Sequence, residues 1–370
     1  MVMRNRRMTV ALASASATAG LALVAGALLL GHAGVPAPAN DPTQRGAAIF
    51  ATPLTPDTGL GPLYNGTACI DCHASPAPGG MGKDGLSTVL RVGQLTDGGF
   101  DPLVGQGGPV ARAHSVTELG ASCDLMPGIP PEANVTSVRN APSLFGDGLI
   151  DTIPDEAIVA GAVAREDGVQ GRVNLVNGRV GRFGWKADTV TLQQFVADAF
   201  RNEHGVTNPG APEDHLPAFR NAAGPCAGES SGLKDDGSRV SAVAAYVGSL
   251  PAPQPASVQP AGEAVFEQIG CASCHTPSLS GVPLYSDLLL HDMGRTLDDK
   301  VVQADARGQD WRTTPLWGLG SRQRFLHDGR ARTIQAAITA HSGEADPAVT
   351  RFRALSPDDR QALLAFLSEL

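Results

Sequence analysis

Hydrophobic residues recur at helical spacing at the C-terminal end of the chain. The apolar positions are Leu363, Leu364, Phe366, Leu367 and Leu370. Ser356 precedes them as a candidate N-cap, and Asp358 and Asp359 follow in the first turn, where carboxylates stabilise the positive end of a helix. We therefore predict an amphipathic helix over this segment that buries its apolar face.

Other helical patterns occur in two similar sets, one in each half of the chain. Gly46–Phe50 and Gly262–Phe266 share glycine at the first position, alanine at the third, a β-branched residue at the fourth and phenylalanine at the fifth. Thr191 and Thr333 each precede a later helical pattern, and a third helix closes each set. The repetition predicts two similar domains. We expect the last helix of the chain to pack on Gly262–Phe266.

A proline-rich stretch separates the two sets. Four of residues 251–261 are proline, and such a composition favours a semi-extended linker. We predict an N-terminal domain over residues 40–250, a linker over residues 251–261 and a C-terminal domain over residues 262–370. Helical patterns dominate both domains, while 44 glycines and 28 prolines indicate many loops. The expected fold class is therefore mostly α, with two domains in tandem and long loops.

The pattern Cys-x-x-Cys-His occurs twice, at residues 69–73 and 271–275. This spacing is typical of c-type haem attachment, in which two thiols bond to the haem vinyl groups and histidine ligates the iron. A zinc site would require the two cysteine pairs to converge on one metal, and it would leave the histidines unexplained. We predict two covalently bound haem c groups in cytochrome c-like domains. The attachment cysteines are Cys69, Cys72, Cys271 and Cys274, and the first iron ligands are His73 and His275.

The N-terminal segment has the pattern of an export signal. Three arginines lie within its first seven residues, small and apolar residues fill positions 9–30, and Ala-Pro-Ala occupies residues 37–39. We predict a signal peptide over residues 1–39 and a periplasmic protein. The apolar run is also long enough to remain as an uncleaved membrane anchor.

Charge and the remaining cysteines add two further expectations. The net charge of -9 argues against nucleic acid as a partner. Cys123 and Cys226 are left over after the two motifs, and an oxidising compartment would allow them to form a disulfide. Sequence alone does not decide between that disulfide and two free thiols.

Several longer phrases occur together in the chain. They are residues Arg139–Ile150, Gly181–Ala187, His291–Gly294, Trp311–Gly318 and Leu326–Ala331. With these phrases, residues 41–370 resemble the bacterial dihaem cytochrome c peroxidase superfamily, which includes the MauG-type enzymes. The chain is most similar to the subgroup called dihaem oxidoreductases. The resemblance implies reduction of hydrogen peroxide at haem 1, with electrons delivered through haem 2.

The second ligand of each iron decides whether that iron can bind peroxide or only pass electrons. For haem 2, the resemblance points to the position after the Thr333 helix, which is His341 here. In the similar enzymes a methionine or tyrosine takes that place, and histidine in its stead would lower the haem potential. Met293 and His291 are alternatives. His327 belongs to a His-Asp-Gly turn that the resemblance implies is structural.

For haem 1, the corresponding helix carries Ala199 at the depth of His341. We therefore expect haem 1 to keep an open coordination position. The resemblance implies that Glu203 transfers the proton of bound peroxide and that Trp185 relays electrons between the haems. His204 is an alternative acid or base. Three further residues are alternative resting-state ligands of haem 1, namely His114, His215 and Met81.

The resemblance also implies partners. A small redox protein, a cytochrome c or a cupredoxin, would supply electrons, and a homodimer is possible. Related peroxidases hold calcium between their domains, but no compact calcium loop is evident in this sequence, so no calcium is predicted. Two other functions stay open. One is a dihaem electron-transfer protein with both irons fully ligated, and the other is MauG-like oxidation of a protein partner.

Overall fold

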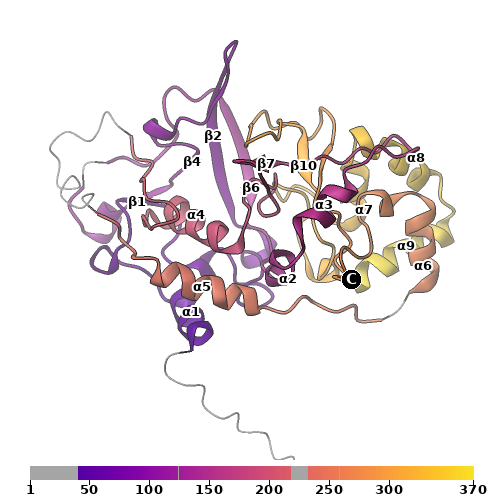
Figure 1. Cartoon of the computed structure of the whole chain (residues 1–370), viewed down its shortest axis with the longest axis horizontal. Coiled ribbons are helices and arrows are strands. Elements are labelled where there is room, and N and C mark those ends of the chain that lie inside the picture. The colour runs from indigo at the N-terminus through magenta and orange to yellow at the C-terminus, as the bar shows by residue number, and fades with distance from the viewer. Residues whose placement is uncertain (1–40, 124, 218–231, 258) are drawn as a thin grey trace, which may run out of the picture. The chain divides into compact units, whose positions relative to one another are not determined.

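Helices and short antiparallel strands alternate along the chain in the computed structural model, which describes residues 41–123, 125–217, 232–257 and 259–370 (Figure 1). The α-helices are α1 (Pro42–Ala51), α2 (Asp147–Asp151), α3 (Asp155–Gly161), α4 (Leu192–His204), α5 (Ser238–Ser249), α6 (Pro260–Gln268), α7 (Ile334–Ala340), α8 (Asp346–Ala354) and α9 (Pro357–Glu369). The strands are β1 (Leu63–Tyr64), β2 (Thr88–Thr96), β3 (Gly99–Asp101), β4 (Val110–Ala111), β5 (His114–Ser115), β6 (Val135–Asn140), β7 (Leu175–Val176), β8 (Arg179–Val180), β9 (Leu290–Asp292) and β10 (Asp310–Arg312).

The prediction of a mostly α fold is wrong. Helix accounts for 35% of the structure and strand for 16%, so the fold is mixed. Much of the strand content is one antiparallel sheet, in which β2 pairs with β3, β4 and β6. Hydrophobic alternation did not reveal β6, because Ser137 and Arg139 are buried whereas Val138 is 42% exposed. The strand therefore presents polar side chains to the interior.

Two helix pairs repeat the same close crossing. In α1, a Cβ atom at Gly46 would lie 1.9 Å from the carbonyl oxygen of Ala242 in α5. In α6, a Cβ atom at Gly262 would lie 2.2 Å from the carbonyl oxygen of Ala362 in α9. Glycine thus permits each crossing. The predicted packing of the last helix on Gly262–Phe266 is confirmed, since Phe266 and Phe366 share one core with ring centroids 5.5 Å apart.

Each half of the chain contributes to a separate hydrophobic core. The larger core is built mainly from α1, α4 and α5 around Phe50, Phe183 and Phe200. It also receives four side chains from the second half, those of Leu284, Leu288, Leu289 and Trp317. The smaller core joins α6 to α9. The cores therefore lie behind the two Cys-x-x-Cys-His turns and support them.

Buried polar contacts join the two halves within the compact unit that spans residues 40–370. The side chain of Lys186, which is 0% exposed, donates to three backbone carbonyls, those of Arg307, Gly308 and Asp310. Arg139 forms an ion pair with Asp299. These contacts place the segment between β8 and α4 against the second half of the chain.

Several other predicted features fall wholly or partly outside the residues that the structure describes. Residues 1–39, the predicted signal peptide, are outside the described residues. Of the predicted linker, Ala252 is buried and the backbone N–H of Ala256 donates to the carbonyl of Glu369 at 2.9 Å. Cys123 is buried and disulfide-bonded, whereas Cys226 is outside the described residues. Within the described ranges, no helix combines the length and hydrophobicity that crossing a membrane requires.

Candidate functional site

Each Cys-x-x-Cys-His motif begins in a tight 3₁₀ turn. The turns are η2 (Cys69–Asp71) and η8 (Cys271–Ser273). In η2, the carboxylate of Asp71 accepts hydrogen bonds at 3.0 and 2.9 Å from two backbone N–H groups just before the motif. The four motif cysteines are free. Burial raises the pKa of all four, to about 12 for Cys69 and Cys271, so they are uncharged thiols.

The two motif histidines are held in the same way. The Nδ1–H group of His73 donates to the carbonyl of Gly80 at 3.0 Å, and that of His275 donates to the carbonyl of Tyr285 at 2.9 Å. Burial lowers the pKa of both histidines to about 4, so both are neutral. The Nε2 atom of each ring therefore keeps its lone pair for a metal, and the backbone carbonyl fixes the ring orientation.

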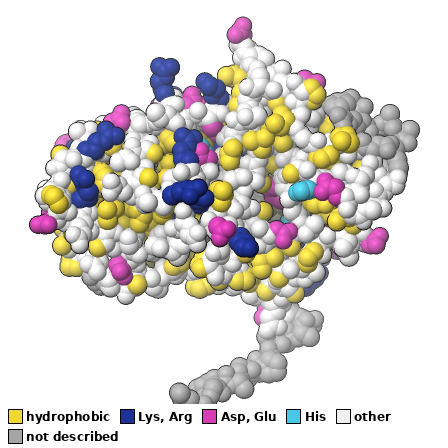
Figure 2. All heavy atoms as spheres, turned by 180° about the vertical axis from the view of Figure 1, so that it is seen from behind, with side chains coloured by type: hydrophobic (Ala, Val, Ile, Leu, Met, Phe, Trp, Pro, Cys, Tyr) yellow, Lys and Arg dark blue, Asp and Glu magenta, His cyan; other side chains and the backbone are white. Residues whose placement is uncertain are grey.

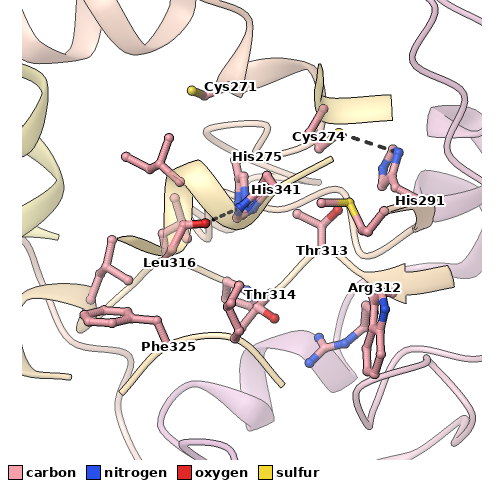
Figure 3. A pocket seen from close by; sticks show the side chains of 18 of the residues that line it. Cys271, Cys274, His275, His291, Arg312, Thr313, Thr314, Leu316, Phe325 and His341 are labelled. Carbon is pink, nitrogen blue, oxygen red and sulfur yellow. Dashed lines mark hydrogen bonds between the residues drawn. The ribbon is translucent and has the colours of Figure 1, made fainter. Parts of the chain in front are cut away.

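His341 comes to the second motif from the end of α7. Its Nδ1–H group donates to the carbonyl of Ala337 at 2.7 Å, which leaves Nε2 free. His341 and His275 line the same cavity, and electrostatic repulsion from His341 contributes to the lowered pKa of His275. Figure 3 shows both imidazoles in this cavity, beside Cys271 and Cys274. The arrangement provides two neutral imidazoles for one iron.

The alternative ligands of haem 2 differ in availability. His291 uses both ring nitrogens, bonding Asp287 at 3.0 Å and Glu344 at 2.8 Å. Although burial alone would lower the pKa of His291, hydrogen bonds to Asp287, Cys274 and Glu344 raise it to about 12. A protonated imidazole has no lone pair for a metal. Met293 lines the cavity.

The cavity around the second motif is largely apolar. Its lining includes Phe266, Leu297, Trp311, Pro315, Leu316, Trp317, Leu319, Phe325, Ile334, Ile338 and Leu367. It extends toward the first motif, where Met81, Pro142 and Trp185 complete the wall. An apolar, concave site beside a Cys-x-x-Cys-His turn is the environment that a porphyrin ring requires.

The C-terminal end of α4 brings Glu203 to the first motif. The side-chain amide of Asn65 donates to Glu203 Oε2 at 2.9 Å, and the backbone N–H of Asn65 donates to the carbonyl of Glu203 at 2.7 Å. Burial raises the pKa of Glu203. Its carboxylate is close enough to Cys72 to raise the pKa of that thiol. The structure therefore brings Glu203 near the haem 1 cysteines.

His204, the next residue, lies against the same motif. Its Nδ1–H group donates to the carbonyl of Gly66 at 2.7 Å, and its Nε2 atom is 3.7 Å from Cys69 Sγ. Burial lowers the pKa of His204, and repulsion from His204 contributes to the lowered pKa of His73. His204 thus has its Nδ1 bound to a carbonyl as His341 does, whereas its Nε2 is in hydrogen-bond contact with the Cys69 thiol.

Buried Arg112 fixes this end of α4. Its guanidinium donates to the carbonyls of Arg201 and Asn202, at 2.9 and 3.3 Å, and to the carbonyl of His215 at 3.1 Å. A cation at a helix C-terminus satisfies carbonyls that have no partner within the helix. Arg112 therefore positions Glu203 and His204 without itself reaching the motif.

Trp185 lies between the segments that carry the two motifs. Its indole N–H donates to the carbonyl of Asn140 at 2.9 Å, and its own carbonyl accepts from the backbone N–H of Arg312 at 3.0 Å. The backbone of Pro142, two residues after Asn140, is close enough to His73 to affect its pKa. Trp185 also lines the cavity of the second motif. Trp185 therefore contacts segments from both halves of the chain.

The remaining ligand candidates of haem 1 are held in different ways. His114 pairs with Glu118 at 2.9 Å near the surface. His215 is buried, and burial lowers its pKa to about 4. Met81 lines the cavity of the second motif. Among the residues that the structure describes, no group of three or more His, Cys, Asp or Glu side chains is arranged as a metal site.

The residues of both sites fit a haem. Each site has two uncharged thiols and a neutral imidazole with a free Nε2 atom, and the second has an apolar cavity. In addition, Arg312 on the cavity wall has a buried Nη1 atom without a hydrogen-bond partner among the described residues. A family model described as "Di-haem oxidoreductase, putative peroxidase" matches residues 131–370. The chain belongs to the di-haem oxidoreductase family. Members of this family carry two haems.

Several solved structures are similar at low identity, whereas no curated protein matches the chain. Diheme peroxidase BthA from Burkholderia thailandensis is 17% identical over 90% of this chain and 86% of its own, with a TM-score of 0.43. A MauG-like protein associated with microbial copper homeostasis is 16% identical over 91% and 90%, also at 0.43. Hydrazine synthase from Kuenenia stuttgartiensis is 13% identical over 95% and 100%, at 0.42. Such values do not establish a shared activity.

Proposed function

We propose that this di-haem oxidoreductase reduces hydrogen peroxide at the first motif, with electrons that enter at the second. The observation that carries the proposal is the carboxylate of Glu203, which Asn65 orients beside the first Cys-x-x-Cys-His turn. When bound, the two haems supply one-electron redox chemistry, and an iron with a free position accepts an external ligand. The family description as peroxidases supports this reaction class.

We further propose that both haems are attached covalently. Each cysteine S–H would add across one vinyl double bond, a step that needs no oxidant. Cys69 and Cys72 would hold haem 1 with His73 as ligand, and Cys271 and Cys274 would hold haem 2. His275 and His341 would ligate the second iron, because both have Nε2 free in one cavity.

Glu203 would handle the protons of the reaction. Reduction of one H₂O₂ to two waters takes two electrons and two protons. A carboxylate beside the peroxide can accept a proton from one oxygen and return it to the departing oxygen. Trp185 would carry electrons between the sites, since its indole N–H bonds Asn140 while its backbone bonds the second half.

The donor would be a small, acidic redox protein that docks on the second half. Exposed arginines there include Arg295, Arg330, Arg332, Arg351 and Arg353. Figure 2 shows Lys and Arg side chains gathered on the left part of one face, although the chain as a whole is acidic. A groove that contains His341 has Arg330 and Arg353 on its walls. Complementary charge would steer an acidic donor to this groove.

Glu203→Gln tests the catalytic assignment. The substitution keeps the shape of the side chain and the contact with Asn65 but removes the proton acceptor. We expect peroxidase turnover of the purified holoprotein to fall by about 10²–10⁴-fold, with the haem spectrum unchanged. Glu213→Gln, the same change at an exposed position, should keep full turnover. Equal turnover in both variants would remove Glu203 from the mechanism.

A second candidate function is electron transfer without a substrate. The observation that favours it is His204, whose Nε2 atom faces the first motif, 3.7 Å from Cys69 Sγ. If His204 ligates haem 1, that iron has two imidazoles and no open position. This candidate shares the haems and the donor surface but predicts no consumption of peroxide.

Electron paramagnetic resonance of the oxidised and half-reduced holoprotein distinguishes the two functions. The peroxidase proposal expects a high-spin haem in at least one of these states, whereas electron transfer alone expects low-spin haems in both. His204→Ala should convert haem 1 to high spin if His204 is its ligand, and should leave the spectrum unchanged otherwise. Wholly low-spin wild-type spectra without peroxide turnover would overturn the peroxidase proposal.

We also propose export to the periplasm. The proposal rests on the arginines and the apolar run of residues 1–39, and on the expectation that haem c is attached outside the cytoplasm. Cell fractionation with N-terminal sequencing checks it. Mature protein that begins near residue 40 in the periplasmic fraction is the expected result, and protein confined to the cytoplasm would contradict it.

A further inference from the structure

Two equivalent arginines begin the Arg-x-x-Pro elements of the two halves, and each reaches toward the other half. Arg139 ends in a buried ion pair with Asp299, and its guanidinium lies 4.3 Å from the centre of the Trp311 ring. Arg312 donates through Nε to the carbonyl of Gly184 at 2.8 Å. The Arg-x-x-Pro element thus occurs in both halves. The arginine of the first is paired with a carboxylate, whereas that of the second is bonded to a backbone carbonyl.

Arg312 lacks the carboxylate partner that Arg139 has. Among the described residues it forms no ion pair, and its Nη1 atom is buried without a hydrogen bond. Some nitrogens of Arg139 are also unbonded, yet its charge is compensated by Asp299. The carboxyls of Asp147 and Asp188 act on Arg312 electrostatically, but neither is in ion-pair contact with it. Burying a guanidinium without a paired anion costs on the order of several kcal/mol, so this position favours an anion.

The position of Arg312 in the cavity indicates which anion would pair with its guanidinium. Figure 3 shows Cys271 and Cys274 on one side of the cavity, His275 and His341 in the middle, and Arg312 on the far side. Haem carries its two vinyl groups on one edge and its two propionate carboxylates on the opposite edge. A haem joined through its vinyl groups to these cysteines would therefore turn its carboxylate edge toward Arg312.

We propose that Arg312 binds a propionate of the C-terminal haem and sets the charge around it. The inference rests on haem attachment at the second motif, as proposed above, but not on peroxide reduction. The bond from Nε to Gly184, next to Trp185, fixes the guanidinium plane, so the Nη1 edge faces the propionate. A guanidinium and a carboxylate form paired, charge-assisted hydrogen bonds.

Redox titration of the holoprotein tests this role. A cation beside the haem favours the reduced state, which carries one positive charge less, so Arg312→Gln should lower the midpoint potential of haem 2. The unpaired propionate should also titrate near neutrality, which would make that potential depend on pH. Haem 1 should keep its potential. His341→Ala identifies which of the two potentials belongs to haem 2.

Two further variants make the test specific. Arg312→Lys keeps the charge and should shift the potential less than Arg312→Gln does. Arg179→Gln removes an exposed arginine of β8 that has no part in the proposed sites and should leave both potentials unchanged. If Arg312→Gln fails to retain haem, resonance Raman spectra of Arg312→Lys should show altered propionate bending modes. Wild-type potentials and wild-type propionate modes in the Arg312 variants would overturn the proposal, whether or not the protein reduces peroxide.

Discussion

His327 shows how a single conspicuous residue can serve packing rather than ligation. Its ring stacks on Trp311 with centroids 3.7 Å apart and an interplanar angle of 12°. The charged groups of Arg139 and Lys186 lie on the same tryptophan, 4.3 and 4.1 Å from the ring centre. Burial and, next, the charge of Arg139 lower the pKa of His327 to about 3. The imidazole is therefore neutral in the folded protein.

This pKa predicts a specific acid sensitivity. Unfolded His327 has an ordinary pKa of about 6.5, so the unfolded state binds more protons between that pH and about 3. The free energy of unfolding should then fall as the pH drops through this window, by at most about 1.4 kcal/mol per pH unit from this residue.

His327→Phe keeps the stacking but cannot titrate. Denaturant unfolding of the variant and the wild type is measured at several pH values. As the pH falls, the free energy of unfolding should decrease less steeply for the variant than for the wild type. Above about pH 6.5 the free energies of the two proteins should depend on pH in the same way. Parallel curves throughout the acid range would show that His327 does not control this stability.

Residue types with fixed spacing were the most predictable part of the site. The two motifs and the position of His341 follow from the sequence, and the structure brings His341 and His275 to one cavity. His204 was assessed only as an acid or base, because counting from the start of the helix led to Ala199. The helix α4 is longer than α7, and counting back from the helix ends brings His204, the last residue of α4, to within one position of His341, the C-cap of α7.

At the level of elements, the helix repeat was predictable and the sheet was not. Glycine followed by phenylalanine marks α1 and α6, because their close crossings allow no side chain at Gly46 or Gly262. By contrast, β6 directs Ser137 and Arg139 inward to bond Asp299 across the two halves. That partner is distant in sequence, so no local pattern could reveal the strand.

Gly262→Val should destabilise the second half. The new Cβ would overlap the carbonyl of Ala362 and crowd Phe366, at 2.2 and 2.5 Å. Overpacking of this kind costs about 1–3 kcal/mol, and more where backbone must move. Denaturant unfolding measures the loss. Gly105→Val places the same side chain in open space, and an equal loss there would show that the helix crossing is not the cause.

At the level of the whole molecule, buried charges join the halves. The ammonium of Lys186 lies 2.7, 2.9 and 3.0 Å from the carbonyls of Arg307, Gly308 and Asp310. It also lies 3.3 Å from the carboxylate of Asp299. Residues from the first half thus complete the hydrogen bonding of a loop in the second.

Lys186→Met should reveal how much this contact contributes. It leaves three buried carbonyls without their donor and removes one cation from Asp299, which should lower the unfolding free energy by about 3–5 kcal/mol. Chemical denaturation checks the value. Lys83→Met at an exposed position should change it by no more than about 0.5 kcal/mol. Similar values for both variants would refute a joining role for Lys186.

The reciprocal exchange of side chains between the halves has a consequence for cooperativity. Arg139 forms its ion pair with Asp299, and the backbone N–H of Arg312 donates to the carbonyl of Trp185. Unfolding of either half would leave buried charged groups or backbone amides of the other half without their partners. Heating should therefore produce one calorimetric transition rather than two, and separately expressed halves should remain unfolded until they are mixed.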